Sequence, residues 1–516
     1  MISQDKFPPS FLYSVIGISM GDEGKGRVVH EVLDQVQEQS GIPPAGVIKV
    51  NGGANAGHTA AGLKLNLLPS GVGNPKVQKL IIGSGVVADP RKFSWEAKPL
   101  EKRGISVFKR LLIDEKTQMS DLTHRLLDLA WENYRVKQLG MENRGSTGRG
   151  ISPAYCDETG QWQIFYQQFL DDRSIFKSLL QSRVQRAMDT IRYVCKVDEN
   201  DWNDFFSTLT DAENRANQEA INEGIFKSHE FDFSVFKGEN PYTINFDYLE
   251  EVYWNAGQQL IDCIGDTRNE LLKSKSESRD IVAEFGQAYW LDKRHGFTPN
   301  VTASHTTTSE LFASAGIPIQ PITTIGCCKA YDTKVGTHHF LTKLDHINHS
   351  LGKKLAKLEF GTSTGRQRMV GWFDGVEKGN ALKYGGFDEL VINKLDALSC
   401  DGESPAELKI CVAYKKISGE IIKYVPRQEA VRKQISPIYE TMSAWKEDLS
   451  QINSFSHLPS EAKHYLARMV NSIIASAYPE GVKNIKLPKI RFVGVGPNPG
   501  QIISDIPDTI DLINKF

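Results

Sequence analysis

The chain has 516 residues, of which 40% are hydrophobic and 24% are charged, and its formal net charge is −2. These values are typical of a globular protein with one enlarged α/β domain or a few ordinary ones, and the near-neutral charge argues against a protein dominated by nonspecific nucleic-acid binding. Seven cysteines without a CxxC pair favour reduced thiols over disulfides or a zinc site. Because the chain has neither ~18 uninterrupted apolar residues nor a signal-peptide layout, we expect a cytoplasmic protein without membrane contacts.

The first predicted strand, Leu12 to Ile18, runs into a glycine-rich loop and then a predicted helix over Val28 to Val36. The loop consists of Gly21, Asp22, Glu23, Gly24, Lys25 and Gly26. Its glycines allow close backbone approach, and Lys25 with the N–H groups at the helix start favours phosphate. Gly26 replaces the Ser or Thr of a Walker A motif. Acids beside a phosphate bind a metal or move a proton, so we predict a P-loop-like site; the alternative is an acidic turn.

Two more polar glycine-rich loops follow in the first third of the chain. The predicted strand Gly46 to Val50 leads into a loop that carries Asn55, Gly57, His58 and Thr59. The loop Arg144 to Pro153 carries Thr147 and Arg149, which suit an anion; the alternative is a basic surface turn. Strands alternating with helices predict a mainly parallel sheet, whose ligand loops lie at the carboxyl ends of its strands.

The region 161–278 is predicted to be mainly helical. Ile175, Leu179, Leu180 and Val184 recur at helical spacing, and a second apolar stripe runs from Phe246 to Ile264. We expect an insertion of helices that pack on the sheet.

The α/β pattern resumes at position 280, with predicted strands at 280–285, 323–331, 390–393, 407–414 and 490–495, the last two completing the sheet. Gln287 and Thr302 lie in polar segments that follow the first of these strands. The loop Phe360 to Arg368 carries hydroxyl and guanidinium groups that suit carboxylates or phosphates; the alternative is a basic hairpin tip. Its candidate ligands are Thr362, Ser363, Thr364, Arg366 and Arg368.

The strand that ends at Asn393 is followed by Lys394, Leu395 and Asp396, an Asn-Lys-x-Asp pattern typical of guanine-reading loops. An Asp carboxylate accepts hydrogen bonds from the ring N–H and the exocyclic amine that distinguish guanine from adenine, and the Lys stem covers the base. The loop with Gly494 and Gly496 is suited to pass close to a base.

Taken together, these loops resemble the adenylosuccinate synthetase family. The matching pieces, which come in the family's order and span nearly the whole chain, are at positions 21–26, 55–59, 67–71, 146–155, 286–287, 301–302, 329–336, 363–366, 371–374, 394–396, 411–414 and 439–442. The resemblance implies one α/β domain over 1–516, with a large, mainly parallel twisted sheet, helices on both faces, a P-loop-like GTP site and a mainly helical insertion at 161–278. The insertion is longer than expected for the family.

The resemblance also implies a GTP-dependent ligase that joins L-aspartate to C6 of a purine nucleoside monophosphate, IMP, through a 6-phosphoryl intermediate. Asp22 and His58 would be catalytic, and Mg²⁺ would be held by Asp22 and the Gly57 carbonyl. GTP would contact residues 21–26, Gly57, His58, Thr59, Arg368, Lys394, Leu395, Asp396, Gly494 and Gly496. The purine nucleotide would contact Asn55, Thr147, Arg149, Gln287, Thr302 and Arg366, and aspartate would contact Thr362, Ser363, Thr364, Arg366 and Arg368. The family forms homodimers with composite sites.

Two departures from the family pattern leave the substrate open. Gln161 stands where the family has an Arg that reaches the 5′-phosphate of the neighbouring subunit, so we expect Arg149 or the insertion to replace it. Gly494 stands where a Ser is usual beside the guanine. The first alternative is a paralogue that converts another purine nucleotide, such as (d)GMP, to a 2-amino product, although that branch tends to lose the Asp at position 22. A regulatory GTP-binding protein would need a Walker A motif and a DxxG switch, which are not found at suitable places.

Overall fold

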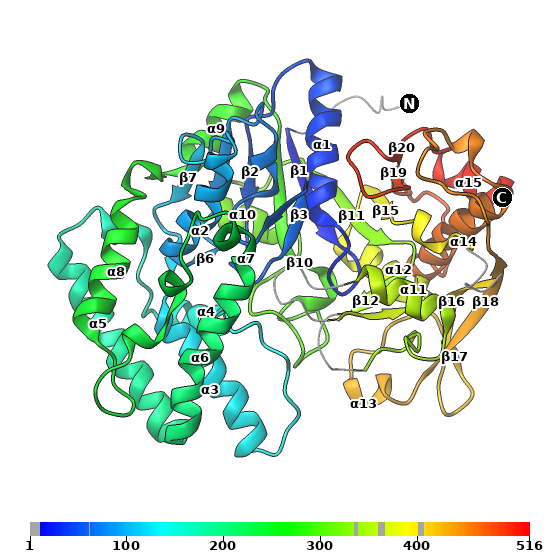
Figure 1. The fold of residues 1–516 in the computed structure, drawn as a ribbon. Helices are drawn as coiled ribbons and strands as arrows, with labels where there is room; N and C mark the ends of the chain where they lie inside the picture. The colour runs from blue at the N-terminus through cyan, green and yellow to red at the C-terminus, as the bar shows by residue number, and fades with distance from the viewer. Residues whose placement is uncertain (1–10, 61, 335–338, 360–366, 401–406) are drawn as a thin grey trace.

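The computed structural model describes residues 11–60, 62–334, 339–359, 367–400 and 407–516. At its centre lies a ten-stranded twisted sheet in which every neighbouring pair is parallel except β19 and β20 (Figure 1). The spatial order is β20 (Ile502–Ile503), β19 (Lys489–Gly494), β15 (Glu389–Asn393), β11 (Thr323–Lys329), β1 (Leu12–Gly17), β10 (Ile281–Ala288), β2 (Gly46–Lys49), β5 (Lys79–Ile82), β7 (Leu111–Asp114) and β9 (Ile264–Gly265). The predicted fold class, an α/β protein with a large, mainly parallel sheet, is confirmed.

Each face of the sheet carries its own hydrophobic core. Strand side chains alternate between faces, so Val15, Val47 and Val282 enter one core while Ile16 and Ile48 enter the other. The first core is covered by α1 (Lys25–Ser40), α2 (Pro90–Lys102) and α3 (Leu122–Lys137). The second is covered chiefly by α12 (Gly375–Gly385) and α14 (Ser460–Ala477).

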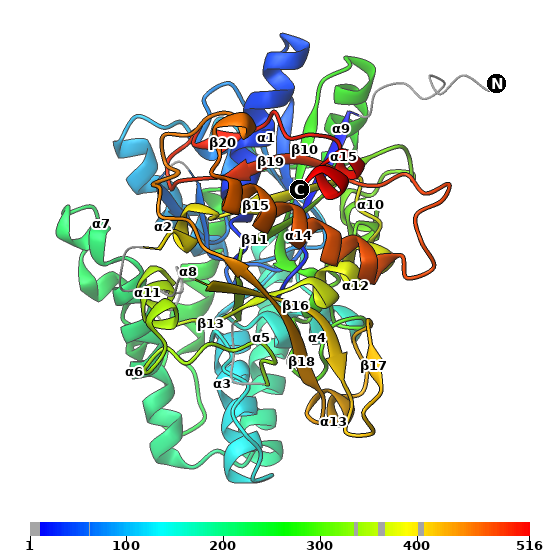
Figure 2. The same cartoon turned by 90° about the vertical axis from the view of Figure 1, so that its right-hand side faces the viewer.

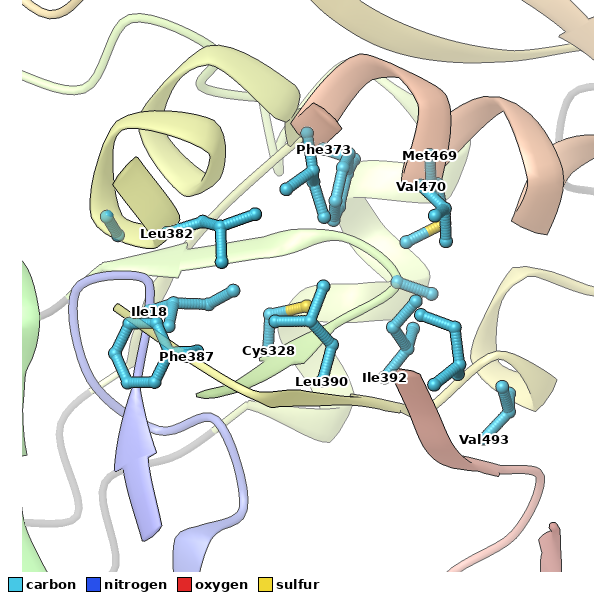
Figure 3. Packing of buried hydrophobic residues seen from close by; sticks show 14 of the residues in the cluster. Ile18, Cys328, Phe373, Leu382, Phe387, Leu390, Ile392, Met469, Val470 and Val493 are labelled. Carbon is cyan, nitrogen blue, oxygen red and sulfur yellow. The ribbon is translucent and has the colours of Figure 1, made fainter. Parts of the chain in front are cut away.

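Figure 3 shows the second core between sheet and helices. Cys328 and Leu390, on neighbouring strands, lie below Leu382 of α12 and Met469 of α14, and all four side chains are buried. Burying a large apolar side chain contributes roughly 1.5–3 kcal/mol, so these contacts hold the strands whose ends carry the loops discussed below.

Further helices surround these layers and are short or lie toward the ends of the molecule (Figures 1 and 2). They are α4 (Ile151–Thr159), α5 (Arg173–Asp189), α6 (Glu199–Ala216), α7 (Gln218–Asn222), α8 (Phe246–Gln258), α9 (Thr267–Ser276), α10 (Ser309–Ala315), α11 (Ser350–Leu358), α13 (Glu429–Arg432) and α15 (Thr509–Lys515). None of the helices in the described ranges is long and apolar enough to cross a membrane.

The region 161–278 contains α5 to α9 and packs against α2 and α3, so that its core is continuous with the first core of the sheet. It also supplies β9, the edge strand beside β7, which the helical pattern did not predict. The prediction that Ile175 and Leu179 of α5 face the core is wrong, because their side chains are 48% and 40% exposed. Phe176 is buried instead, and its ring packs against the rings of Phe169 and Trp254.

The predicted strand at 407–414 does not complete the central sheet. It forms β16 (Glu407–Lys415), which belongs to a separate small sheet with β14 (Phe373–Asp374), β17 (Ile421–Ile422) and β18 (Ser436–Ser443). In Figure 2 this sheet lies below α14. An apolar strand pattern shows burial but not the partner strand, so the sequence could not distinguish the two sheets.

Candidate active site

The first glycine-rich loop joins the end of β1 to the start of α1. Gly21, Asp22 and Gly24 all have positive φ angles, of 102°, 63° and 81°. Gly24 is the residue before the first helical position, Lys25. A non-glycine residue held at positive φ is strained, and such strain is concentrated at functional sites. The loop therefore holds the backbone of Asp22 in a conformation that aspartate does not prefer by itself.

Glu23 and Lys25 form a buried pair beneath this loop. The Glu23 carboxylate accepts from the Gly21 N–H (2.7 Å) and from Lys25 Nζ (2.8 Å), and both side chains are nearly inaccessible. Burial lowers the pKa of Lys25, but Glu23, together with Cys327 and Asp22, outweighs this effect and raises that pKa above its ordinary value. Lys25 therefore stays charged, with Glu23 as its internal counterion.

Asp22 is part of the loop, and its carboxylate is paired with the guanidinium group of Arg368. Burial would raise the pKa of Asp22, but the charges of Lys329 and Arg368 outweigh it and hold that pKa below its ordinary value. The carboxylate is therefore ionised and engaged by a guanidinium group. Because Arg368 is a predicted contact of GTP and aspartate, substrates that take this guanidinium would release Asp22 for other partners.

His58 begins β3 (His58–Ala60), which pairs with β4 (Leu63–Leu65). Its Nδ1 contacts the Glu284 carboxylate of β10, while its Nε2 is buried and has no hydrogen-bond partner among the described residues. Glu284 also accepts from the N–H and the hydroxyl of Ser70, at 2.6 and 2.9 Å. A carboxylate at Nδ1 fixes the ring orientation and leaves Nε2 as the reactive atom.

The loops with Asp22 and His58 leave the same edge of the sheet. Strands β1 and β2 flank β10 on its two sides, and all three run parallel. Their carboxyl ends therefore point the same way, as in other parallel sheets whose ligand loops cluster at strand ends. The predicted catalytic residues are brought to this edge, with Glu284 on the strand between them.

The predicted guanine loop lies directly beside the phosphate-type loop. Asn393 Nδ2 donates to the Glu23 carbonyl (2.8 Å), and the Leu395 N–H donates to the Gly494 carbonyl (3.0 Å). Arg27 of α1 donates to the carbonyl of Gly496. The guanine loop follows β15, which is separated from β1 only by β11 and is flanked on its other side by β19. The guanine loop therefore lies between the phosphate-type loop and the loop with Gly494 and Gly496.

Two side chains of this guanine loop are available to a base. Asp396 Oδ1 is buried without a hydrogen-bond partner in the described part of the chain, and burial raises the pKa of Asp396. Lys394, at φ 60°, donates to Glu359 (2.7 Å) and is about one-third exposed. An orphaned carboxylate oxygen beside an amphipathic lysine suits a ring N–H and an aromatic face.

A group of polar side chains lies at the end of β10 and in the segments after β2 and β10. Gln287 is buried, its Oε1 is within 3.4 Å of Asn51 Nδ2, and its Nε2 has no partner among the described residues. Asn55 accepts from the Gly53 N–H (3.1 Å), and the Thr302 N–H donates to the Leu291 carbonyl (2.8 Å). Nε2 of Gln287 is therefore a buried donor that a ligand or a water can satisfy.

Thr147 and Arg149 have different surroundings. Thr147 is half-buried, whereas Arg149 is buried and paired with Glu213 of α6. A direct contact of Arg149 with a substrate phosphate would require this pair to separate. Gln161 is exposed at a positive φ of 62° after α4, so its side chain has no part in this cluster.

Several predicted contacts cannot be placed. Thr362, Ser363, Thr364 and Arg366 lie outside the described residues. Thr59 lies in β3, but its side chain is not described.

The predicted magnesium ligands are a carboxylate and a backbone carbonyl. Among the described residues, no group of three or more His, Cys, Asp or Glu side chains could hold a metal ion. Mg²⁺ nevertheless needs few protein ligands, because it keeps waters and takes substrate phosphates. The ionised Asp22 and the Gly57 carbonyl are hard oxygen donors, so they fit this ion.

Two buried acids were missed by sequence reasoning. Glu284 positions His58, and Glu359 accepts from Lys329 (2.8 Å), Lys394 and Tyr331. Glu284 lies within β10 and Glu359 follows α11 just before the predicted loop at 360–368, so neither position carries a local signal of its partners. Their partners are remote in sequence, so the pairing could not be read from the chain.

Comparison with known proteins places the chain in a family. The adenylosuccinate synthetase family model matches residues 14–231 and 211–497, two stretches that overlap within the helical region. An adenylosuccinate synthetase from Acetivibrio thermocellus is 32% identical over 496 residues, which cover 95% of this chain and 98% of that protein. The fully ligated adenylosuccinate synthetase from Plasmodium falciparum superposes with a TM-score of 0.74 at 25% identity, covering 96% of this chain and 100% of that one.

A more distant solved structure shares the fold alone. The cyanophage S-2L succinoaminodeoxyadenylate synthetase, bound to dGMP and dATP, has a TM-score of 0.51 at 14% identity and covers 98% of each chain.

A parallel sheet with polar loops and the His58–Glu284 pair at the carboxyl ends of its strands is typical of a nucleotide-dependent α/β enzyme, and the family match makes this enzyme a ligase. The chain belongs to the adenylosuccinate synthetase family, whose members are GTP-dependent ligases of purine biosynthesis.

Proposed function

We propose that this enzyme joins L-aspartate to C6 of IMP, converting IMP, L-aspartate and GTP to adenylosuccinate, GDP and phosphate. The observation that carries the proposal is the pairing of His58 with Glu284, which leaves a buried Nε2 free at the sheet edge where Asp22 also lies. Retention of Asp22 favours a 6-oxopurine without a 2-amino group.

In the first step, Asp22 accepts the N1 proton of the purine, so that negative charge develops on O6. O6 attacks the γ-phosphorus of GTP, the bond from this phosphorus to the bridging oxygen breaks, and GDP leaves. Nε2 of His58 faces the oxygens being transferred and donates to them, while Glu284 carries the counter-charge. Lys25 and the N–H groups at the start of α1 hold phosphate oxygens.

In the second step, the amine of L-aspartate attacks C6. The new C–N bond forms, the C6–O bond breaks with loss of phosphate, and the surplus amine proton passes to solvent. Arg368, with Arg366 and the hydroxyls of Thr362, Ser363 and Thr364, holds the two carboxylates of aspartate. Asn55, Thr147, Gln287 and Thr302 hold the purine nucleotide.

Lys394, Leu395, Asp396, Gly494 and Gly496 read guanine. Mg²⁺, held by Asp22 and Gly57, supplies positive charge to the phosphates. We further propose a homodimer in the cytoplasm, which light scattering of the purified protein and imaging of a tagged copy test.

The proposal is tested with purified protein, GTP, magnesium, L-aspartate and IMP, by following the absorbance of an N6-succinyl adenine. We expect product only when all substrates are present. A nucleotide panel with GMP and dGMP in place of IMP tests the alternative substrate, which would give a 2-amino product. If no purine nucleotide in the panel supports aspartate-dependent GTP cleavage, the proposal is wrong.

A further inference from the structure

The loop that carries Thr147 is held from one side by α3. The Glu132 carboxylate accepts from Arg144 Nε (3.3 Å) and from the Gly145 N–H (3.1 Å). The Asp128 carboxylate accepts from Ser146 Oγ (2.7 Å) and from the Gly150 N–H (3.1 Å). Arg125 Nε donates to the Gly148 carbonyl (3.0 Å). Thr147 makes no hydrogen bond with the other described residues. Its hydroxyl is thus one of the groups of the loop that have no protein partner in the described part of the chain.

From the other side, the helical region contributes one fully buried carboxylate, Glu213 of α6. It accepts from Arg125 Nη1 (2.9 Å), pairs with Arg149 and lies 3.7 Å from Lys92 Nζ. It also accepts from Asn217, one turn later on the chain (3.3 Å). One acid therefore joins α2, α3 and the loop of Thr147 to the helical region.

Three cations, Lys92, Arg125 and Arg149, are buried close to one another around Glu213. Burial lowers the pKa of Arg149 to about 9, with Arg125 adding to the effect, and burial together with Arg149 lowers the pKa of Lys92 to about 8. Removing one partner of a buried ion pair leaves uncompensated charge, so Arg125 and Arg149 would move if Glu213 were neutral. Arg125 holds the Gly148 carbonyl and Arg149 is itself part of the loop, so Thr147 would move with them.

We propose that Glu213 is a positioning residue for the purine nucleotide: through Arg125 and Arg149 it sets the loop that presents Thr147 to the substrate. This inference rests on the proposed function, in which Thr147 holds the nucleotide. The helical region is then a part of the binding site that acts without touching the substrate. The helical region supplies the Glu213 carboxylate as the partner of Arg149, which then does not contact the substrate phosphate.

The test compares Glu213→Gln with Glu219→Gln, a matched control in α7. Glu219 is also an ion-paired glutamate of the helical region, but it is 64% exposed and contacts Arg103. We expect Glu213→Gln to raise the KM for IMP about tenfold or more while the KM for GTP stays within twofold. Glu219→Gln should leave both values within twofold of wild type.

The direction of the change separates the inference from its rivals. A lower KM for IMP in Glu213→Gln would mean that Glu213 masks Arg149 as a direct phosphate ligand, and would overturn the inference. An unchanged KM, or equal changes in the KM for GTP and IMP, would also overturn it, because a purely structural role affects all substrates alike.

Should Glu213→Gln fail to fold, Glu213→Asp gives the same reading, because it keeps the charge but shortens the side chain that reaches Arg125 and Arg149. It should raise the KM for IMP selectively, and a value equal to wild type would contradict the inference. Equilibrium binding of IMP alone is measured for every variant. Turnover by the wild-type enzyme tests the proposed function, whereas the ratio of variant to wild-type affinity tests the role of Glu213.

Discussion

Two charged regions of the molecule differ in what their ion pairs do. Around the phosphate-type loop, Asp22 pairs with Arg368 and Lys394 pairs with Glu359, and Asp22 and Lys394 are 20% and 36% exposed; the Lys25–Glu23 pair of the same loop is buried and is not part of this exposed set. Around Glu213, the paired side chains are at most 5% exposed. A pair that solvent reaches can exchange one partner for a substrate, whereas a fully buried pair would leave an uncompensated charge.

The comparison separates ligand groups from scaffold groups of the same residue type. Arg368 and Arg149 both belong to predicted anion-binding loops that contain glycines. Their environments differ, because Arg368 contacts the Asp22 carboxylate at the sheet edge and Arg149 contacts the Glu213 carboxylate inside the helical region. We therefore expect the first set of charges to control turnover and the second to control geometry.

The largest expected effect is at the exchangeable pair itself. Asp22→Asn removes the base and should lower kcat by about 1,000-fold or more, within the range of general base catalysis. GTP affinity, measured by equilibrium binding, should change by less than tenfold, since Lys25 and the backbone remain. Asp511→Asn, in an exposed pair of α15, serves as the control. Retained turnover would remove the base assignment.

A buried positioning acid should have the next largest effect. Glu284→Gln keeps an oxygen for Ser70 but removes the charge that faces His58, so kcat should fall about 100-fold with a small change in KM. Steady-state kinetics measure the two constants separately. A variant as active as wild type would show that His58 does not depend on this carboxylate.

At the guanine loop, the change should alter the choice of base more than the rate. Asp396→Asn replaces an acceptor with a donor, so the KM for GTP should rise about 10- to 100-fold, the loss expected for a charge-assisted hydrogen bond. Xanthosine triphosphate, which carries a carbonyl in place of the amine, should become the better substrate. If the wild-type enzyme and Asp396→Asn showed the same preference between GTP and xanthosine triphosphate, the recognition of guanine by Asp396 would be contradicted.

The buried pair at Glu284 also predicts a dependence of stability on pH. Burial raises the pKa of Glu284, but His58, Lys49 and the hydrogen bonds from Ser70 outweigh it and lower that pKa from 4.5 to about 2. The stabilisation is present above pH 4.5 and is lost as pH falls toward 2. At pH 4 the loss is about 1 kcal/mol by linkage. Urea unfolding at pH 6 and 4 should show this loss in wild type but not in Glu284→Gln; equal losses would argue against it.

The smallest effect is expected at an exposed pair of the helical region. Arg103 contacts Glu219 (2.8 Å) and Glu223 (2.7 Å) and is 41% exposed. Arg103→Ala should change the free energy of unfolding by no more than about 0.5 kcal/mol, because solvent screens such pairs. A loss above 2 kcal/mol in thermal or urea unfolding would show that exposure does not separate the two kinds of pair.

Local patterns predicted much of this molecule. Glycines beside Asp22 and His58, and the Asn-Lys-x-Asp pattern at Lys394, marked three loops at strand ends, and the alternation of strands and helices predicted the parallel sheet. The same patterns assigned β16 to the wrong sheet and Ile175 to the wrong face of α5, because burial of an apolar residue does not name its neighbour. The roles of the predicted site residues stay predictions until the variants above are measured.

By itself the sequence determined the loops, since glycine content, charge and position after a strand are properties of neighbouring residues. Only the tertiary structure decided which charges meet: Glu284 lies 226 residues from His58, and Arg368 lies 346 residues from Asp22. Ion pairs form wherever the packed elements place opposite charges in contact, and burial then decides whether the pair is exchangeable. This is why Arg368 and Arg149, alike in sequence, have different partners, from which we expect different roles.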